Sequence, residues 1–326
     1  MLKVLVGAGI FIILLEPMPQ AASAHSHLQS PRRAPSAKAN RLDPRLAAAI
    51  KQNDIPLAHS LIRGVNLEAR DRFGMTALLR AAQAGRPEIV KDLLAAGAHI
   101  DAPNGDSATP LNYAVRKGSM ESVMLLLQGG ADVNKGDRNI GPPLMDACQT
   151  QRLDIARILV EHGARVNTAA PLGYGNTPLI VAAGKGATDL VSYLVEHGAK
   201  VNAANVGGGT PLHAAAGAGA KDLVVYLLDH GAKVNAVDLD GRTPLDDALA
   251  FQTPYVQSER LQKLSVPPYG RPATPDEVKQ RLAYQQLSEQ EAAEHRETDK
   301  RHAGEIAEIL RQHGGKIGPG EPKDGG

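Results

Sequence analysis

A phrase that recurs at a nearly constant interval constrains this chain more than any other feature. It is clearest as Thr-Pro-Leu-His-Ala-Ala-Ala-Gly at residues 210–217. Versions of it begin at Thr76, Thr109, Pro142, Thr177, Thr210 and Thr243, at spacings of 33, 33, 35, 33 and 33 residues. A Gly-Ala pair follows each of the first five starts after 21 residues. A two-part signal of constant period predicts a repeat array rather than a single globular core.

Each period contains signals for two short helices. The threonine suits the N-cap of the first helix, and the proline fits its first turn, where the missing N–H removes no hydrogen bond. Apolar residues at helical spacing, as in Leu223, Val224 and Leu227, predict the second helix. The glycine of the Gly-Ala pair suits a left-handed residue after that helix. We therefore expect helix, turn, helix and a projecting hairpin in every unit.

The combined pattern D-x-x-G-x-T-P-L-H-x-A-A…G-A-x-V-N resembles the ankyrin repeat. The stretches beginning at Asp238 and Thr210 match it closely, and the resemblance covers residues 43–251 and 304–317. It implies an all-α repeat solenoid, an ankyrin-repeat array with β-hairpin loops. The departures are local: Pro142 replaces the first threonine, and Asn112, Ile180 and Asp246 replace the histidine.

The two ends of the chain predict export and a capped array. Residues 1–24 combine Lys3, a short apolar run and Ala22-Ser23-Ala24, which indicates a cleaved signal peptide. An uncleaved membrane anchor and a secreted protein are the alternatives to a bacterial periplasmic location. Residues 25–42 are basic and proline-containing, so we expect a disordered leader. Residues 43–251 then hold repeats one to six and the first helix of the seventh.

The seventh unit is interrupted. Its closing Gly314-Gly315 comes 71 residues after Thr243 instead of 21, so residues 252–303 form an insertion. Thr274-Pro-Asp-Glu277 is a capping box that predicts a long polar helix within it. We expect the closing helix of the repeat at 304–317 and a flexible tail at 318–326. The insertion is either a solvated helix along the end of the array or a binding arm.

The sequence offers no case for catalysis, a cofactor or a metal. Cys148 falls on an inward-facing position, where a buried thiol is inert. His162, His197 and His230 each precede a closing glycine, so we interpret them as helix C-caps. Gly207-Gly-Gly209 lies at a hairpin tip, and Asp246-Asp247 lie in a first helical turn, so both are structural. No hydrolase, zincin, Walker or dinucleotide motif occurs between residues 25 and 326.

The resemblance therefore implies a protein that binds another protein, of unknown identity, through hairpin tips and the concave face of the first helices. The net charge of +1 gives no argument for nucleic acid, and we expect a monomer with no membrane insertion after cleavage. The expected face leans basic, which would suit an acidic partner surface. Its predicted residues are Arg72, Phe73, Met75, Gln83, Asp106, Arg116, Lys117, Arg138, Asn139, Gln149, Tyr174, Asn176, Lys185, Asp240, Arg242 and Phe251. A small-molecule or polymer site in the 252–303 insertion is the alternative.

Overall fold

The computed structural model describes residues 41–172, 174–250 and 300–318. The expected signal peptide, all of the leader before residue 41, Phe251, the insertion up to residue 299 and the tail after residue 318 lie outside these ranges. The long polar helix predicted in the insertion is among the features outside them.

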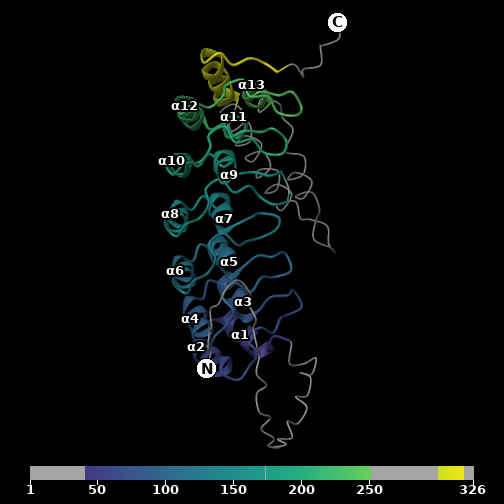
Figure 1. Cartoon of the computed structure of the whole chain (residues 1–326), viewed down its shortest axis with the longest axis vertical. Coiled ribbons are helices and arrows are strands. Elements are labelled where there is room, and N and C mark those ends of the chain that lie inside the picture. Colours follow the sequence, from purple (N-terminus) through teal and green to yellow (C-terminus); the bar gives the residue numbers. More distant parts are fainter. Residues whose placement is uncertain (1–40, 173, 251–299, 319–326) are drawn as a thin grey trace, which may run out of the picture. The chain divides into compact units, whose positions relative to one another are not determined.

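Short helices in antiparallel pairs make up the described part of the chain. They are α1 (Pro44–Gln52), α2 (Ile55–Ile62), α3 (Ala77–Ala84), α4 (Pro87–Ala95), α5 (Pro110–Lys117), α6 (Met120–Gln128), α7 (Pro143–Gln149), α8 (Leu153–Glu161), α9 (Pro178–Gly184), α10 (Thr188–Glu196), α11 (Pro211–Gly217), α12 (Lys221–Asp229) and α13 (Pro244–Ala250). Residues 300–312 are also helical. Odd-numbered helices stack in one column and even-numbered helices in another (Figure 1). The prediction of a helical repeat array is confirmed.

The loops between successive helix pairs project from the odd-numbered column (Figure 1). Among the described residues these loops contain only isolated β-bridges, such as the one between Asp137 and Gly141, and no sheet. Each first helix begins where the sequence predicts. The side chain of Thr210, for example, accepts a hydrogen bond from the His213 N–H, and Pro211 occupies the first turn.

Leucine, valine and alanine fill the space between the two columns. Leu111, Leu144, Leu179 and Leu212 hold the same position in successive first helices, and each is at most 1% exposed. Small alanines beside them let the stacked helices approach closely. Cys148 takes one of these small positions and is fully buried, as predicted. Because each repeat buries its apolar face only against its neighbours, the core is one continuous stack.

Asparagine side chains connect neighbouring repeats from Asn134 onward. The Nδ2 atoms of Asn134, Asn167, Asn202 and Asn235 donate to the carbonyls of Gly163, Gly198, Gly231 and Gly314, at 3.1, 2.9, 2.8 and 2.9 Å. Their Oδ1 atoms accept from the backbone N–H of Arg165, Lys200, Lys233 and Lys316. The last member shows that the 300–312 helix occupies the place of a second helix in the final repeat.

The closing glycines have a conformation that other residues resist. Gly97, Gly130, Gly163, Gly198 and Gly231 have φ between +83° and +89°, and Gly314 has +85°. Next to four of them a histidine caps the helix: Nδ1 of His162, His197, His230 and His313 lies 2.8, 2.7, 2.7 and 2.8 Å from the carbonyl oxygen four residues earlier. The C-cap interpretation of this histidine column is confirmed.

No helix in the ranges that the structure describes has the length and apolar content needed to cross a bilayer.

Candidate protein-binding surface

Most of the predicted binding residues lie exposed on the projecting loops or on the open side of the first helices. These are Arg72, Phe73, Gln83, Asp106, Lys117, Arg138, Asn139, Gln149, Tyr174, Lys185, Asp240 and Arg242. Asn176 and Arg116 are half-buried. Met75 is only 3% exposed, so its prediction as a surface residue is wrong. It directly precedes the N-cap Thr76 and packs inward, while its neighbour Phe73 points to solvent.

Backbone hydrogen bonds connect the tips of neighbouring hairpins. The N–H of Arg138 donates to the carbonyl of Asp106 at 2.9 Å, and that of Leu172 donates to Arg138 at 3.0 Å. The same link joins Val206 to Tyr174 at 2.8 Å and Leu239 to Gly207 at 2.9 Å. The tips are therefore not independent loops, because each is fixed to the one before it.

Four large apolar side chains gather on the last three of these tips. Leu172, Tyr174, Val206 and Leu239 are 54%, 77%, 71% and 80% exposed. The backbone links just described place them next to one another, so they form a row that we call the tip ridge. The sequence pointed to Tyr174, whereas Leu172 and Val206 were missed. One apolar residue in a single turn does not indicate a binding surface. Aligning the hairpin tips of successive repeats would have shown that several neighbouring tips carry an apolar residue.

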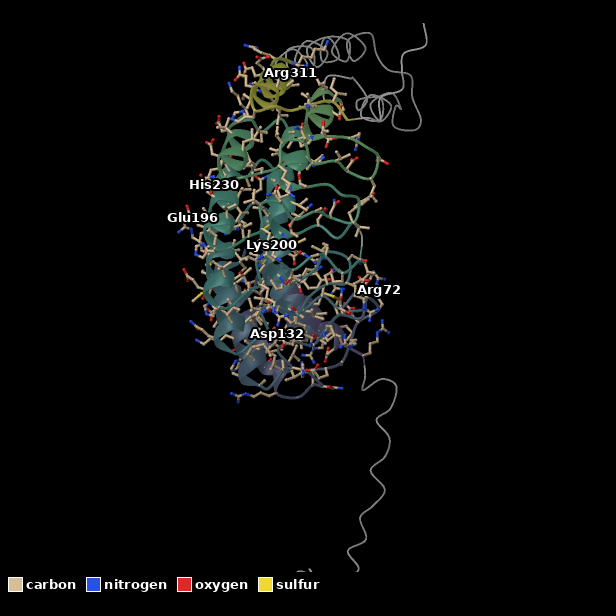
Figure 2. All side chains as sticks on the ribbon, turned by 45° about the horizontal axis from the view of Figure 1, so that its top comes forward. Arg72, Asp132, Glu196, Lys200, His230 and Arg311 are labelled. Carbon is tan, nitrogen blue, oxygen red and sulfur yellow. The ribbon has the colours of Figure 1, made fainter. Side chains whose placement is uncertain are left out.

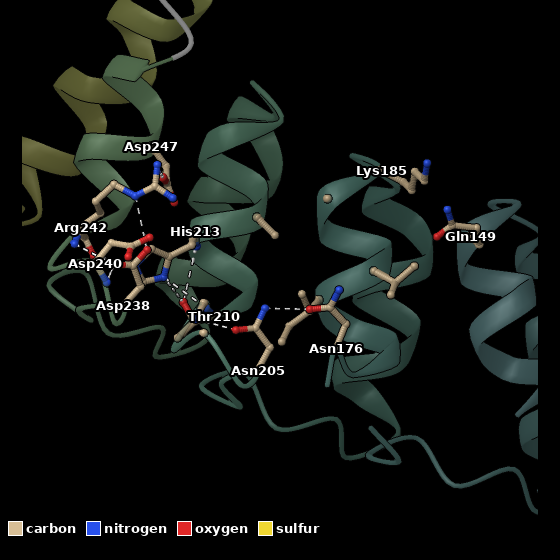
Figure 3. A pocket seen from close by; sticks show the side chains of 16 residues that line it. Gln149, Asn176, Lys185, Asn205, Thr210, His213, Asp238, Asp240, Arg242 and Asp247 are labelled. Carbon is tan, nitrogen blue, oxygen red and sulfur yellow. Dashed lines mark hydrogen bonds and ion pairs between the residues drawn. The ribbon is translucent and has the colours of Figure 1, made fainter. Parts of the chain in front are cut away.

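A groove of about 460 Å³ lies between these hairpins and the first helices α9, α11 and α13 (Figure 3). Gln149 and Lys185 lie at one end of it, and Asp238, Asp240, Arg242 and Asp247 lie at the other (Figure 3). Small residues that line it include Gly184, Gly207, Gly209 and Ala214. Its volume lies within the range of about 300–1,000 Å³ that is usual for binding sites in proteins.

The acidic end of the groove is loosely neutralised. Arg242 reaches both carboxylates there, with Nε 3.4 Å from Oδ2 of Asp238 and Nη1 3.5 Å from Oδ1 of Asp247. Half of its side chain is exposed. Burial raises the pKa of Asp247, and Arg242 only partly offsets that effect. Burial also acts to raise the pKa of the neighbouring Asp246. The N–H groups of Thr243 and Gly318 donate to its carboxylate, however, and these hydrogen bonds outweigh burial, so that its pKa is lowered.

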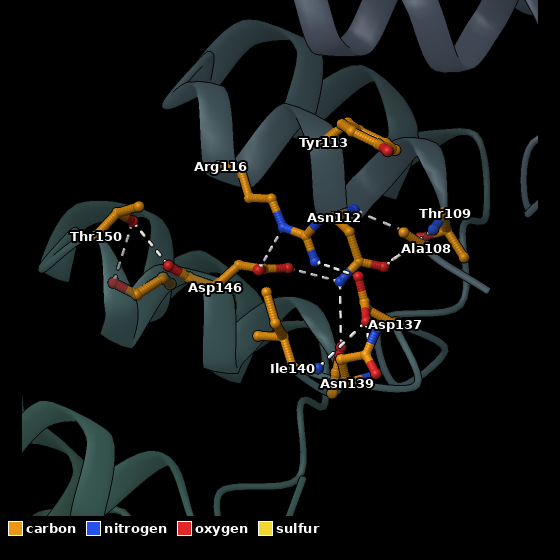
Figure 4. A network of polar contacts seen from close by, with 12 residues as sticks. Ala108, Thr109, Asn112, Tyr113, Arg116, Asp137, Asn139, Ile140, Asp146 and Thr150 are labelled. Carbon is orange, nitrogen blue, oxygen red and sulfur yellow. Dashed lines mark hydrogen bonds and ion pairs between the residues drawn. The ribbon is translucent and has the colours of Figure 1, made fainter. Parts of the chain in front are cut away.

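Arg116, by contrast, is held inside the array (Figure 4). Its Nε donates to Asp146 at 2.6 Å and its Nη2 donates to Asp137 at 2.8 Å, and Asn112 also donates to Asp146 at 2.6 Å. Asp146 is 1% exposed. Burial raises the pKa of the Asp146 carboxyl to about 6 even though both donors favour its ionised form. Burial opposes the charge of Arg116, but pairing with Asp146 and Asp137 outweighs it and raises its pKa. Arg116 therefore joins two repeats.

At the other end of the array two guanidinium groups lie close to the ring of Phe73. The Cζ atoms of Arg72 and Arg80 are 4.7 and 5.3 Å from the centre of its ring, within cation–π range. Arg80 is itself paired with Asp71 of the same hairpin. Phe73 remains 62% exposed. It is a second exposed apolar feature, separated along the array from the tip ridge by the polar tips of Asp106, Arg138 and Asn139.

The described residues contain no cluster of three or more metal-ligating side chains. Burial raises the pKa of the Cys148 thiol well above its usual range, so this group stays protonated. His213 bonds to Thr210 and approaches the carbonyl of Arg242 at 3.2 Å, which is a structural role. Taken together, stacked helix pairs with a polar groove and an exposed apolar ridge define a solenoid repeat protein.

Comparison with known proteins gives this solenoid its family. A family model described as ankyrin repeats (3 copies) matches residues 46–137, 135–205 and 202–257. The chain belongs to the ankyrin-repeat family, as the sequence resemblance implied. Ankyrin-repeat domains are generally protein–protein interaction modules.

Two solved structures show the same arrangement. The ankyrin repeat domain of Bcl-3, described as a unique member of the IkappaB protein family, is similar with a TM-score of 0.57 and 28% identity, over 64% of this chain and 94% of that one. The human ASB11 ankyrin repeat domain is similar with a TM-score of 0.58 and 29% identity, over 71% of this chain and all of that one. No curated protein sequence matches the chain.

Proposed function

We propose that this protein is an exported, non-catalytic adaptor or scaffold that binds a partner protein through the tip ridge and the adjoining groove. The observation that carries the proposal is the tip ridge itself: four large apolar side chains, each more than half exposed, on neighbouring loops. Exposed apolar side chains that cluster next to polar groups are typical of interaction surfaces. Tyrosine with an apolar neighbour is a frequent anchor in such interfaces.

Because the repeats are linked to one another, little conformational entropy should be lost when a partner binds. Tip-to-tip hydrogen bonds and the asparagine ties hold the ridge in one arrangement before any partner arrives. A preorganised surface loses little conformational entropy on association, so a modest interface can bind stably. The function therefore requires no chemical step.

A mapped capture experiment tests this proposal. Tagged chain from residue 25 onward is used to capture proteins from a periplasmic extract, alongside the double variant Tyr174→Ser/Leu239→Ser. Both side chains are at least 77% exposed, so the variant should fold normally. Glu196→Ser is the matched control, because this exposed residue lies on the even-numbered column, away from the hairpins (Figure 2).

A partner captured by the parent chain and by the Glu196 control, but lost from the double variant, is the expected result. Equal capture by all three proteins would contradict binding through the ridge. Phe73→Ser is tested in the same experiment. If only this variant fails to capture the partner, the binding surface lies at the other end of the array.

Export has its own test. Expression of the full chain in a Gram-negative host, followed by fractionation and intact mass analysis, should give a periplasmic protein that begins at His25. A chain that keeps Met1 and sediments with membranes would support the uncleaved anchor instead.

A further inference from the structure

The Arg116 arrangement provides a template for the acidic end of the groove. Arg116 lies 21 residues before Asp137 and 30 residues before Asp146. In the last repeat Asp238 and Asp247 occupy the same repeat positions as Asp137 and Asp146, because Pro142 and Thr243 are equivalent starts. Counting back the same distances leads to one residue, Gly217. The chain repeats both carboxylates but has a glycine where Arg116 supplies its guanidinium from the preceding first helix.

The surroundings of the two acidic pairs correspond as well. α7 and α13 are each seven residues long, with their aspartate at the same place. Asn112 donates from α5 to the carbonyl of Gly141 at 3.3 Å. Its equivalent, His213 on α11, approaches the carbonyl of Arg242 at 3.2 Å. The packing that brings Asp137 and Asp146 around one guanidinium is therefore reproduced around Gly217.

Within residues 41–172, 174–250 and 300–318, no side chain takes the position in the last repeat that Arg116 fills. A Cβ placed on Gly217 would lie 3.8 Å from the Cβ of Asp247, at ordinary contact distance. The groove comes within one helical turn of this point, because His213 and Ala214 of α11 line it together with Asp238 and Asp247. Among the described residues, only Arg242 pairs with the carboxylate of Asp247. Arg242 is half exposed, and its contacts with Asp238 and Asp247 are 3.4 and 3.5 Å long. The corresponding contacts of Arg116 are shorter, at 2.8 and 2.6 Å.

We infer that an arginine side chain of the partner polypeptide enters the acidic end of the groove, towards Gly217, and binds Asp238 and Asp247. This inference rests on the proposed function and names the chemistry of the partner segment. The planar guanidinium can donate to both carboxylates at once, as Arg116 does with Asp137 and Asp146, whereas an ammonium group has no such fork. Leu239 and Val206, which lie on the tips beside the groove, receive apolar residues next to that arginine.

This site also changes the expected charge of the partner. The basic residues of the predicted face suggested a partner with an acidic surface. Several of these residues lie on hairpins outside the groove, however, and Arg116 is paired with Asp146 inside the array. The groove itself presents Asp238, Asp240 and Asp247 at one end. A cationic side chain at that end, followed by apolar residues along the ridge, fits the described residues better.

The test uses the full chain and displayed random octapeptides. Peptides are selected on the parent protein and on Gly217→Arg, which supplies the missing guanidinium from α11 and closes the site. Gly217→Ala is the matched control, since it adds only a methyl group. The best peptide is then resynthesised with its arginine changed to citrulline, which keeps the shape and removes the charge.

Arginine should be enriched among peptides captured by the parent and by Gly217→Ala, and lost with Gly217→Arg. The citrulline peptide should bind about tenfold more weakly or worse, as expected for charge-assisted hydrogen bonds. Arg242→Ala should bind the arginine peptide at least as well as the parent, because it frees the two carboxylates.

Absence of arginine enrichment, or equal binding of the citrulline peptide, would overturn the inference. So would a partner protein whose capture depends on Tyr174 and Leu239 but not on Gly217→Arg, and in that case the proposed function would remain. A circular dichroism spectrum and unfolding midpoint for each variant show that a loss of binding reflects the site rather than the fold.

Discussion

Nε of Arg116 donates to Oδ1 of Asp146 at 2.6 Å and thereby joins the first helices of two neighbouring repeats. Asp146 is almost completely buried, whereas about a quarter of the Arg116 side chain reaches solvent. A carboxylate in that position depends on its partners, since an unpaired buried charge is costly. The residue expected to bind a partner is therefore one that maintains the stack.

Arg116→Met should lower the free energy of unfolding by about 3 kcal/mol, because it leaves Asp146 and Asp137 without their shared cation. Urea unfolding followed by circular dichroism measures this loss. The double variant Arg116→Met/Asp146→Leu should recover a large part of it. Arg242→Met is the matched control at an exposed pair, where a change of at most about 1 kcal/mol is expected. Equal effects at the two arginines would contradict the structural role of Arg116.

The raised pKa of Asp146 predicts an unusual dependence of stability on pH. A carboxyl whose pKa is about 6 in the folded chain and near 3.9 when unfolded binds more protons in the folded state between those values. Its contribution is therefore greatest below about pH 4 and is lost as the pH rises to about 6. The lowered pKa values of Asp71 and Asp137 act in the opposite direction, since their stabilisation is lost as the pH falls through the acidic range.

Asp146→Asn isolates this contribution, because it removes the titrating group and keeps the shape. Between pH 4 and pH 7 the parent should lose up to about 3 kcal/mol relative to the variant, from 1.36 kcal/mol for each pKa unit. Urea midpoints at half-unit pH steps measure the difference. Parallel curves for the two proteins would mean that Asp146 is ionised throughout and that Arg116 compensates its burial fully.

Two glycines that look alike in the sequence should respond oppositely to alanine. Gly198 has φ of +86°, and no atom lies within 4 Å of the place that an added Cβ would take, so Gly198→Ala introduces only backbone strain, about 1–2 kcal/mol. Gly217 ends α11 with an ordinary helical backbone, so Gly217→Ala should stabilise by about 0.5 kcal/mol. Thermal and urea unfolding of both variants checks the signs. Destabilisation at both sites would mean that close packing over Gly217, not backbone freedom, determines its cost.

The fold was predictable because its signals are local and repeated. A threonine before a proline begins most of the first helices, and a glycine follows each second helix of the repeats, whatever the distant sequence contains. The surface was less predictable. Met75 and Phe73 are two residues apart in one hairpin, yet one is buried and the other exposed. Which of them faces solvent depends on how the preceding and following hairpins pack against it.

The acidic site in the groove can be recognised only when the last repeat is compared with an earlier one. Asp238 and Asp247 look like an ordinary hairpin acid and an ordinary first-turn acid. Their importance is visible only because Asp137 and Asp146 hold a guanidinium at the same positions, and because Gly217 replaces Arg116. The burial that gives those carboxylates their properties comes from the neighbouring repeat, which no local pattern encodes.

Asn235 should control how firmly the final helix is attached. Its side chain donates to the carbonyl of Gly314 at 2.9 Å and accepts from the N–H of Lys316 at 2.7 Å. Asn235→Ala removes both bonds, at about 1 kcal/mol each. Because a solenoid opens from its ends, hydrogen exchange of residues 300–314 should quicken by about tenfold or more while α7 to α10 stay protected. Asn235→Asp keeps the acceptor and should give an intermediate rate. Uniform acceleration along the chain would show instead that the array unfolds as one cooperative unit.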